Sequence, residues 1–234
     1  MKWDVELNNS LKWSQEITNY DKKMNVAKKI ASFVKDGDVI GAGSGSTSFL
    51  AIQEIAKRIK KENLHVRFIP TSFEIKAACV ALGLNVISLS EAKPDWCYDG
   101  ADEVDPHHWL IKGRGGAMFN EKLVMKCAAK KYIIVDSSKF VNRLCEKFPV
   151  PVECVPAAAP YVMRKLYSLG AKEVSARFAG KSKDGPVITE NGNYIIDAKF
   201  DNVNENLEKE IKAIVGVVES GLFIGYDVEV LDSD

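Results

Sequence analysis

The chain of 234 residues lacks a surplus of charge of either sign, because 32 basic and 32 acidic side chains give a formal net charge of +0. Nucleic acids and acidic membrane surfaces are usually bound by broad basic fields, so neither is expected as a partner. The chain also lacks an apolar run of the roughly 20 residues that span a bilayer. Its first residues have no apolar signal-peptide core, and we expect a cytoplasmic protein.

Patterns for metal binding and disulfide formation are missing as well. The five cysteines are widely spaced and form no Cys-x-x-Cys pair. The three histidines form no His-x-x-x-His pair, and two of them, His107 and His108, are adjacent. Without such spacings we expect no metal and no cofactor. Buried free thiols are the ordinary state of cysteines in a chain of this kind.

Strand and helix patterns alternate over the first 140 residues or so. A short apolar strand at 39–40 precedes a helical pattern at 46–60, and a further strand at 65–69 follows. Alternation of this kind is typical of a parallel sheet covered by helices on both faces. The sequence therefore predicts an α/β protein with a Rossmann-like parallel sheet.

The pattern changes near residue 148, where a β-α-β-β-α order begins. Asn191-Gly192 between the strand patterns 186–189 and 194–198 is a strong hairpin signal. This order predicts a smaller inserted α+β domain of ferredoxin-like type at 148–214. Residues 1–147 and 215–234 would form the catalytic domain. The β-forming stretch 216–231 is expected to rejoin its sheet.

A glycine-rich segment from Gly41 to Thr47 follows the first strand and reads Gly-Ala-Gly-Ser-Gly-Ser-Thr. Glycines let backbone amides approach an anion, and the start of the next helix adds positive potential. The segment lacks the Gly-Lys-Ser/Thr ending of a Walker loop, and it has no glycine at the sixth position of the dinucleotide-binding fingerprint. The segment therefore predicts either a phosphate site or a tight turn between strand and helix.

Two acids, Asp99 and Asp102, lie three positions apart in the segment Asp-Gly-Ala-Asp-Glu. Two carboxylates at the end of an apolar strand are suited to acid or base catalysis. A turn with solvated acids, or a helix cap, is the structural alternative. The sequence thus makes this pair a catalytic candidate and does not decide between a catalytic and a structural role.

A lysine among glycines, in Lys112-Gly113-Arg114-Gly115-Gly116, precedes Glu121 at the start of a helical pattern. The ammonium of Lys112 can stabilise an oxyanion, and the glycines let a substrate touch the backbone. The alternatives are a flexible surface turn for the lysine segment and a helix-dipole partner for Glu121. Because each of the three polar segments follows a strand pattern, all three can meet at one edge of the sheet.

Taken together, these segments resemble the ribose-5-phosphate isomerase type A family in order and spacing. The similarity runs from about Asp21 to Leu231 and includes Asp136-Ser137-Ser138-Lys139 and the segment from Phe148 to Glu153. The family interconverts ribose 5-phosphate and ribulose 5-phosphate without a metal, in the non-oxidative pentose phosphate pathway. The resemblance implies the same activity here, through an enediolate, in a homodimer or homotetramer.

The resemblance also implies roles for single residues. Glu121 would be the base that moves a proton between C2 and C1, and Lys112 would hold the enediolate charge. Asp99 and Asp102 would assist ring opening and handle hydroxyl protons. The residues implied to hold the substrate and its phosphate are Lys23, Ser44, Gly45, Ser46, Thr47, Gly100, Ala101, Gly113, Arg114, Gly115 and Lys139.

Three departures from the family pattern stand out. The family usually has threonine in place of Ser44 and glycine in place of Arg114, and the segment before Asp21 is longer than expected. Arg114 would either grip phosphate or narrow the site, which leaves an altered pentose preference as one alternative. A sugar-phosphate-binding regulator without catalysis is another. No helix-turn-helix pattern or basic stripe favours it.

Overall fold

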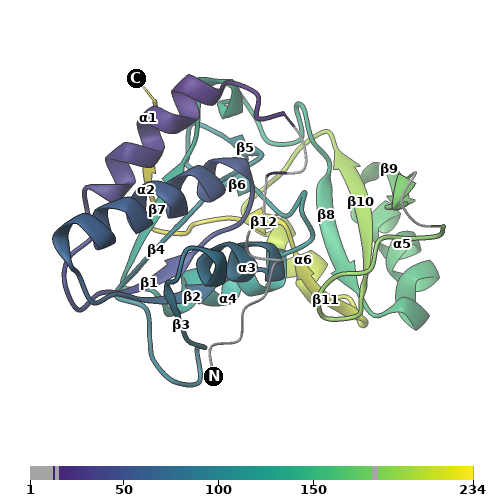
Figure 1. Cartoon of the computed structure of the whole chain (residues 1–234). Helices are drawn as coiled ribbons and strands as arrows, with labels where there is room; N and C mark the ends of the chain where they lie inside the picture. Colours follow the sequence, from purple (N-terminus) through teal and green to yellow (C-terminus); the bar gives the residue numbers. More distant parts are fainter. Residues whose placement is uncertain (1–12, 14–15, 181–183, 234) are drawn as a thin grey trace. The chain divides into compact units, whose positions relative to one another are not determined.

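The computed structural model describes residues 13, 16–180 and 184–233 and contains two compact units (Figure 1). The first unit consists of residues up to 100, residues 123–138 and residues from 228 onward. The second consists of residues 101–122 and 139–227. The domain division inferred from sequence stays a prediction, as does any role for the segment before Asp21, most of which lies outside the described residues.

A six-stranded parallel sheet forms the centre of the first unit. Its strands are β1 (Val39–Ala42), β2 (Arg67–Pro70), β3 (Asn85–Val86), β4 (Trp96–Asp99), β7 (Lys130–Ile134) and β13 (Glu229–Leu231). Their spatial order is β13-β7-β4-β1-β2-β3, and every neighbouring pair is parallel. The predicted parallel sheet is confirmed, and the C-terminal stretch rejoins it through β13.

Helices pack on both faces of this sheet. They are α1 (Tyr20–Ala31), α2 (Ser46–Glu62), α3 (Phe73–Ala81) and, on the other face, the later residues of α4 (Met118–Cys127). On β1, Ile40 and Ala42 join a core cluster with buried residues of α1, α2 and α3. Gly41 points the opposite way, where an added Cβ would lie 2.4 Å from Val124 of α4.

The second unit contains a four-stranded antiparallel sheet with two helices. The strands are β8 (Val150–Cys154), β9 (Ala171–Ala176), β10 (Tyr194–Phe200) and β11 (Val217–Ser220), and the helices are α5 (Ala159–Ser168) and α6 (Leu207–Lys212). The chain order β-α-β-β-α-β and the strand order β11-β8-β10-β9 give the predicted ferredoxin-like arrangement (Figure 1).

The predicted hairpin between 186–189 and 194–198 is wrong in one arm. The turn is present, since Gly192 has φ +78° and its amide donates to Thr189 O at 2.9 Å. Residues 186–189, however, make only isolated bridges, at Phe178–Pro186 and Ile188–Tyr194. Strand β9 pairs with β10 from Ile196 onward and β8 pairs along the other edge, so residues 186–189 reach β10 only at its first residue, Tyr194.

A small three-stranded antiparallel sheet completes the second unit. It consists of β5 (Glu103–Val104), β6 (Leu110–Ile111) and β12 (Leu222–Phe223), with β6 in the middle. The segment beginning at Lys112 follows β6, so the expectation that all three polar segments follow strands of the parallel sheet is wrong for this one. The chain leaves the parallel sheet at Asp99, the last residue of β4, and the hairpin from β5 to β6 then leads to Lys112 within the small sheet.

Candidate active site

The glycine-rich segment and the first acid lie at the ends of neighbouring parallel strands, β1 and β4. Asp99 is buried, and its Oδ1 accepts hydrogen bonds from the amides of Ser44 at 3.1 Å and Gly100 at 2.8 Å. A Cβ on Gly43 would lie 2.3 Å from the Asp99 carboxyl carbon. Only glycine lets the loop come this close, so the loop fixes one oxygen of a buried catalytic candidate.

The start of α2 brings a cation and a helix terminus together. The helix begins at Ser46 after Gly45, whose φ of +90° suits glycine. The buried Lys23 of α1 donates from Nζ to Ser46 Oγ at 3.1 Å. Thr47 is also buried. Amides at a helix start together with an ammonium group favour an anion, which is the arrangement that the sequence predicted for a phosphate.

Thr71 is a polar neighbour that the sequence analysis missed. It directly follows β2, and its hydroxyl lies 2.7 Å from Ser44 Oγ and donates to Ala42 O at 3.1 Å. The signal was available, because Thr71 follows the strand next to β1 at the same edge of the sheet. The hydroxyl of Thr71 therefore holds the hydroxyl of Ser44 in place.

The segment after β7 contributes a polar cluster to the first unit. Asp136 Oδ1 accepts from the amide of Ser138 and from Asn19 Nδ2, both at 3.0 Å, and Lys22 Nζ donates to Ser137 Oγ at 2.8 Å. Burial raises the pKa of Asp136, but these hydrogen bonds and the charge of Lys23 outweigh it, so the pKa is lower than usual. The cluster thus holds an ionised carboxylate.

In the second unit, a buried ion pair joins two of the predicted catalytic residues. Lys112 Nζ lies 3.4 Å from Glu121 Oε2, and the side chains are only 2% and 6% exposed. The amide of Lys112 donates to Gly221 O at 2.9 Å, and its ammonium lies 5.7 Å from the centre of the Phe223 ring. A carboxylate and an ammonium in this arrangement can move a proton and stabilise an oxyanion.

Asp102 contacts the backbone of Arg114 in the loop 112–116, which we call the lysine loop. The amide of Arg114 donates to Asp102 Oδ2 at 3.1 Å, while the side chain of Arg114 is exposed. Gly113 has φ +90°, and a Cβ there would lie 2.8 Å from that of Met118. This hydrogen bond holds the Asp102 carboxylate next to the backbone of Arg114.

Two buried residues, each next to a predicted catalytic residue, make several hydrogen bonds. Glu103 is completely buried and accepts from the amides of Cys145 and Phe148, both at 2.7 Å. Lys122 donates to Glu208 at 2.7 Å, to Glu219 at 2.9 Å and to the carbonyl of Leu222 at 2.8 Å. These bonds fix the positions that follow Asp102 and Glu121.

The structure therefore brings the predicted residues together in two sets. One contains Lys23, Ser44, Ser46, Thr47 and Asp99, and the other contains Asp102, Lys112, Arg114 and Glu121. Gly45, Gly100, Gly113 and Gly115 lie within the loops of these sets, as Ala101 does. Lys139 ends the 3-10 helix Ser137–Lys139, and its ammonium lies 5.5 Å from the centre of the Phe148 ring. That these residues line one pocket stays a prediction.

Two further features of the described residues bear on the site. They contain no group of three or more His, Cys, Asp and Glu side chains that could hold a metal ion. No helix within the same residues is long and apolar enough to cross a bilayer.

Comparison with known proteins identifies the family. The family model described as ribose 5-phosphate isomerase A (phosphoriboisomerase A) matches residues 67–233. The chain belongs to this family. The isomerase A of Methanocaldococcus jannaschii is 46% identical over 214 residues, which cover 90% of this chain and 93% of that protein. That of Archaeoglobus fulgidus is 45% identical over 206 residues, covering 86% and 89%.

Solved structures of the ribose 5-phosphate isomerase A family share the fold. The Methanocaldococcus jannaschii structure superposes with a TM-score of 0.88 at 46% identity, covering 92% of this chain and 95% of that chain. A D-ribose-5-phosphate isomerase in complex with phospho-erythronic acid gives a TM-score of 0.87 at 37% identity, with the same coverage of 92% and 95%. The fold expected from the sequence is therefore confirmed.

Proposed function

We propose that this chain is an aldose–ketose isomerase that interconverts D-ribose 5-phosphate and D-ribulose 5-phosphate. Membership in the family supports this activity. The observation that carries the mechanism is the buried pair of Lys112 and Glu121, 3.4 Å apart. The pair supplies the two groups that enediolate chemistry needs, a base for a carbon-bound proton and a cation for the resulting oxyanion.

Glu121 removes the proton from C2 of the open-chain aldose, and the electron pair moves through C1 onto the carbonyl oxygen. Lys112 stabilises the resulting enediolate oxygen. The protonated Glu121 then returns the same proton to C1, while the C2 hydroxyl loses its proton and becomes the ketose carbonyl. Because the Glu121 side chain is only 6% exposed, exchange of the carried proton with water is slow.

The two aspartates handle protons on oxygen. Asp99 and Asp102 open the sugar ring and move protons between the hydroxyls at C1 and C2. Backbone amides of Ser44 and Gly100 hold one oxygen of Asp99, and the amide of Arg114 holds one oxygen of Asp102. Each carboxylate is thus oriented by the loop next to it, and this orientation supports its role.

The phosphate of the substrate binds at the start of α2. Lys23, Ser46 and Thr47 supply charge and hydroxyl groups there, and the helix terminus supplies amides. The other residues that we propose for substrate binding are Ser44, Gly45, Gly100, Ala101, Gly113, Arg114, Gly115 and Lys139. The sequence similarity to isomerases, one of them solved with phospho-erythronic acid bound, supports a sugar phosphate as the substrate class.

Several expectations accompany this function. We propose catalysis without metal or cofactor, in the cytoplasm, by a homodimer or homotetramer with no nucleic acid or membrane partner. Prolonged treatment with a chelator should leave turnover unchanged. Strong inhibition that added metal reverses would contradict the metal-free mechanism.

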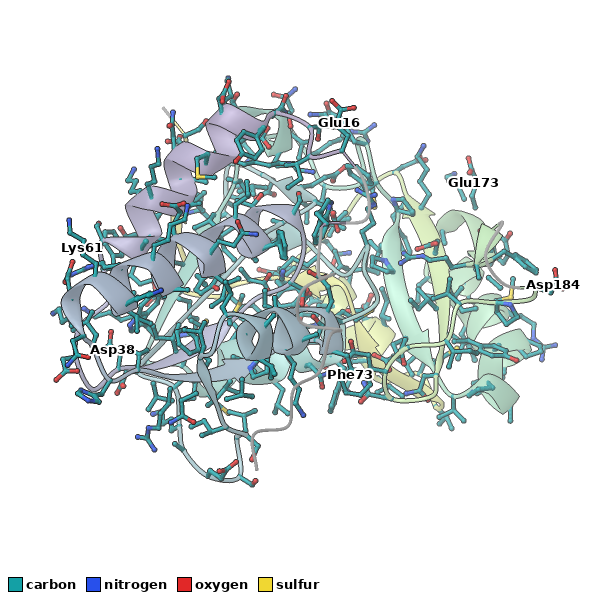
Figure 2. The ribbon with its side chains drawn as sticks, in the orientation of Figure 1. Glu16, Asp38, Lys61, Phe73, Glu173 and Asp184 are labelled. Atoms are coloured by element: carbon teal, nitrogen blue, oxygen red, sulfur yellow. The ribbon has the colours of Figure 1, made fainter. Side chains whose placement is uncertain are left out.

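A coupled assay with ribose 5-phosphate tests the proposal. Glu121→Gln should lower kcat on the order of 10²–10⁴-fold, with a smaller change in KM, because it removes the base and keeps the shape. Glu173→Gln is the matched control, since Glu173 is exposed at the outside of the second unit (Figure 2). Near-normal turnover of Glu121→Gln would exclude it as the base. Binding of ribose 5-phosphate without turnover by the wild type would favour the regulator instead.

A further inference from the structure

The loop that carries Lys112 needs an external anchor. Gly113, Gly115 and Gly116 make it rich in glycine, and chain with many glycines loses the most conformational freedom when it is ordered. Two of them, Gly113 and Gly116, have φ values of +90° and +85°. The ammonium of Lys112 can meet a developing oxyanion only if this loop is held in one conformation.

Arg177 supplies such an anchor from the end of β9. Its Nη1 donates to the carbonyl of Gly113 at 3.2 Å and to that of Arg114 at 2.6 Å. One guanidinium nitrogen therefore holds two successive peptide groups of the loop. Both contacts are to backbone, so they act on the path of the chain whatever side chain stands at position 114.

The guanidinium is itself fixed by Asp197 of β10. Arg177 Nε donates to Asp197 Oδ2 at 2.8 Å, and Nη2 pairs with Oδ1, so the contact is bidentate. Both side chains are 19% exposed. The amide of Arg177 also donates to Ile195 O at 2.8 Å, which continues the pairing of β9 with β10. The ferredoxin-like sheet thus provides a rigid base, and the ion pair brings no net charge to the loop.

We propose that Arg177, oriented by Asp197, is a positioning residue that holds the loop of Lys112 in its catalytic conformation. This inference rests on the proposed isomerase function. It gives the smaller sheet a part in catalysis, because a residue of that sheet fixes a loop that stabilises the enediolate. Other bonds to the same loop run from the amide of Lys112 to Gly221 O, from the amide of Arg114 to Asp102 and, within the loop, from the amide of Gly116 to Gly113 O. Arg177 holds the carbonyls of Gly113 and Arg114 from outside the loop.

Kinetics of Arg177→Ala test the role. Because Lys112 acts on the transition state, a misplaced loop should lower kcat about 10²-fold with a smaller change in KM. Millimolar guanidinium should restore part of the lost kcat, and ammonium should not. Arg177→Lys should stay impaired, since one ammonium cannot reproduce the bidentate contact with Asp197 and still reach both carbonyls. Asp197→Asn should lower kcat less than Arg177→Ala does. It replaces Arg177→Ala as the test variant if that variant does not fold.

Hydrogen exchange measures the loop without reference to activity. Amides of a peptide covering 112–117 should exchange faster in Arg177→Ala than in the wild type, while peptides of β8 and β10 should not change. Arg143→Ala is the matched control, because Arg143 also donates to a backbone carbonyl of the second unit, that of Asp201. The control should alter neither loop exchange nor kcat.

The outcomes separate the positioning role from the proposed function. Wild-type kcat in Arg177→Ala, or unchanged loop exchange with a loss of kcat that guanidinium does not restore, would overturn the positioning role. An equal loss in Arg143→Ala would do the same. A wild type without isomerase activity would overturn the proposed function. Hydrogen exchange of the peptide 112–117 would then test by itself whether Arg177 holds the loop.

Discussion

Lys112 Nζ and Glu121 Oε2 lie 3.4 Å apart in surroundings that leave 2% and 6% of their side chains exposed. Nine positions separate the two residues in the chain. The lysine follows a strand of the small antiparallel sheet, and the glutamate lies in the first turn of α4. A buried pair of opposite charges costs desolvation energy, so its presence at this position points to function rather than to stability.

Lys112→Met removes the charge and keeps much of the length. We expect a loss of kcat on the order of 10²–10³-fold, the range found when an oxyanion donor is removed. Removing one member of a buried pair should also lower the free energy of unfolding by about 3–5 kcal/mol. Urea denaturation measures this loss. The double variant Lys112→Met/Glu121→Met should recover much of the stability and none of the activity, and equal stabilities of the single and double variants would contradict the pairing.

Gly43→Ala tests the close approach of the glycine loop to Asp99. The added Cβ would lie 2.3 Å from the carboxyl carbon and 2.5 Å from the Cα of Asp99, so backbone must move. We expect a loss of about 1–3 kcal/mol in stability, as for other overpacked sites, and a lower kcat. Gly115→Ala is the stability control, because a Cβ there meets nothing within 4 Å. Equal melting temperatures for the two variants would refute the close contact.

Arg114→Gly tests the departure from the family pattern that the sequence resemblance implies at this position. The side chain of Arg114 is exposed, and its charge should attract an anionic substrate. We expect KM for ribose 5-phosphate to rise several-fold with kcat nearly unchanged, and the difference to shrink at high ionic strength. Arg114→Lys keeps the charge and should keep KM. A lower KM in Arg114→Gly, or a change in pentose preference, would show instead that Arg114 narrows the site.

Thiol reactivity should follow burial. Desolvation raises the pKa of Cys79 to about 12, and those of Cys145 and Cys154 to about 11, from an ordinary value of 9.0. These thiols are therefore neutral at pH 8, and the partly exposed Cys127 should be alkylated first. Mass spectrometry after iodoacetamide treatment, with and without urea, checks this order, and equal rates in the folded protein would contradict it.

The same shifts predict how stability changes in alkali. A raised pKa means that the folded protein binds the thiol proton more tightly than the unfolded chain does. The resulting stability is complete below pH 9.0 and decreases as the pH rises toward 11–12. Cys79→Ala should weaken this dependence in urea titrations at pH 8 and pH 10.

Local patterns were sufficient for much of the fold. The helix at 46–60 and the turn at Asn191-Gly192 depend on apolar spacing and on residues that favour a left-handed backbone, both of which are properties of neighbouring positions. The strand predicted at 186–189 failed for a different reason. Its pairing depends on which strands occupy the edges of β10, and β8 and β9 pair with most of that strand.

The sequence by itself made Asp99, Asp102, Lys112 and Glu121 catalytic candidates, because their types and their spacing among glycines depend on neighbouring positions alone. Tertiary structure alone decided which atoms meet. It placed Lys112 beside Glu121, Thr71 beside Ser44, and Arg177 on the lysine loop. The physical reason is that hydrogen bonds and ion pairs require distances of about 3 Å. In these three contacts such distances depend on how strands, helices and loops pack, which the spacing of residues along the chain does not give.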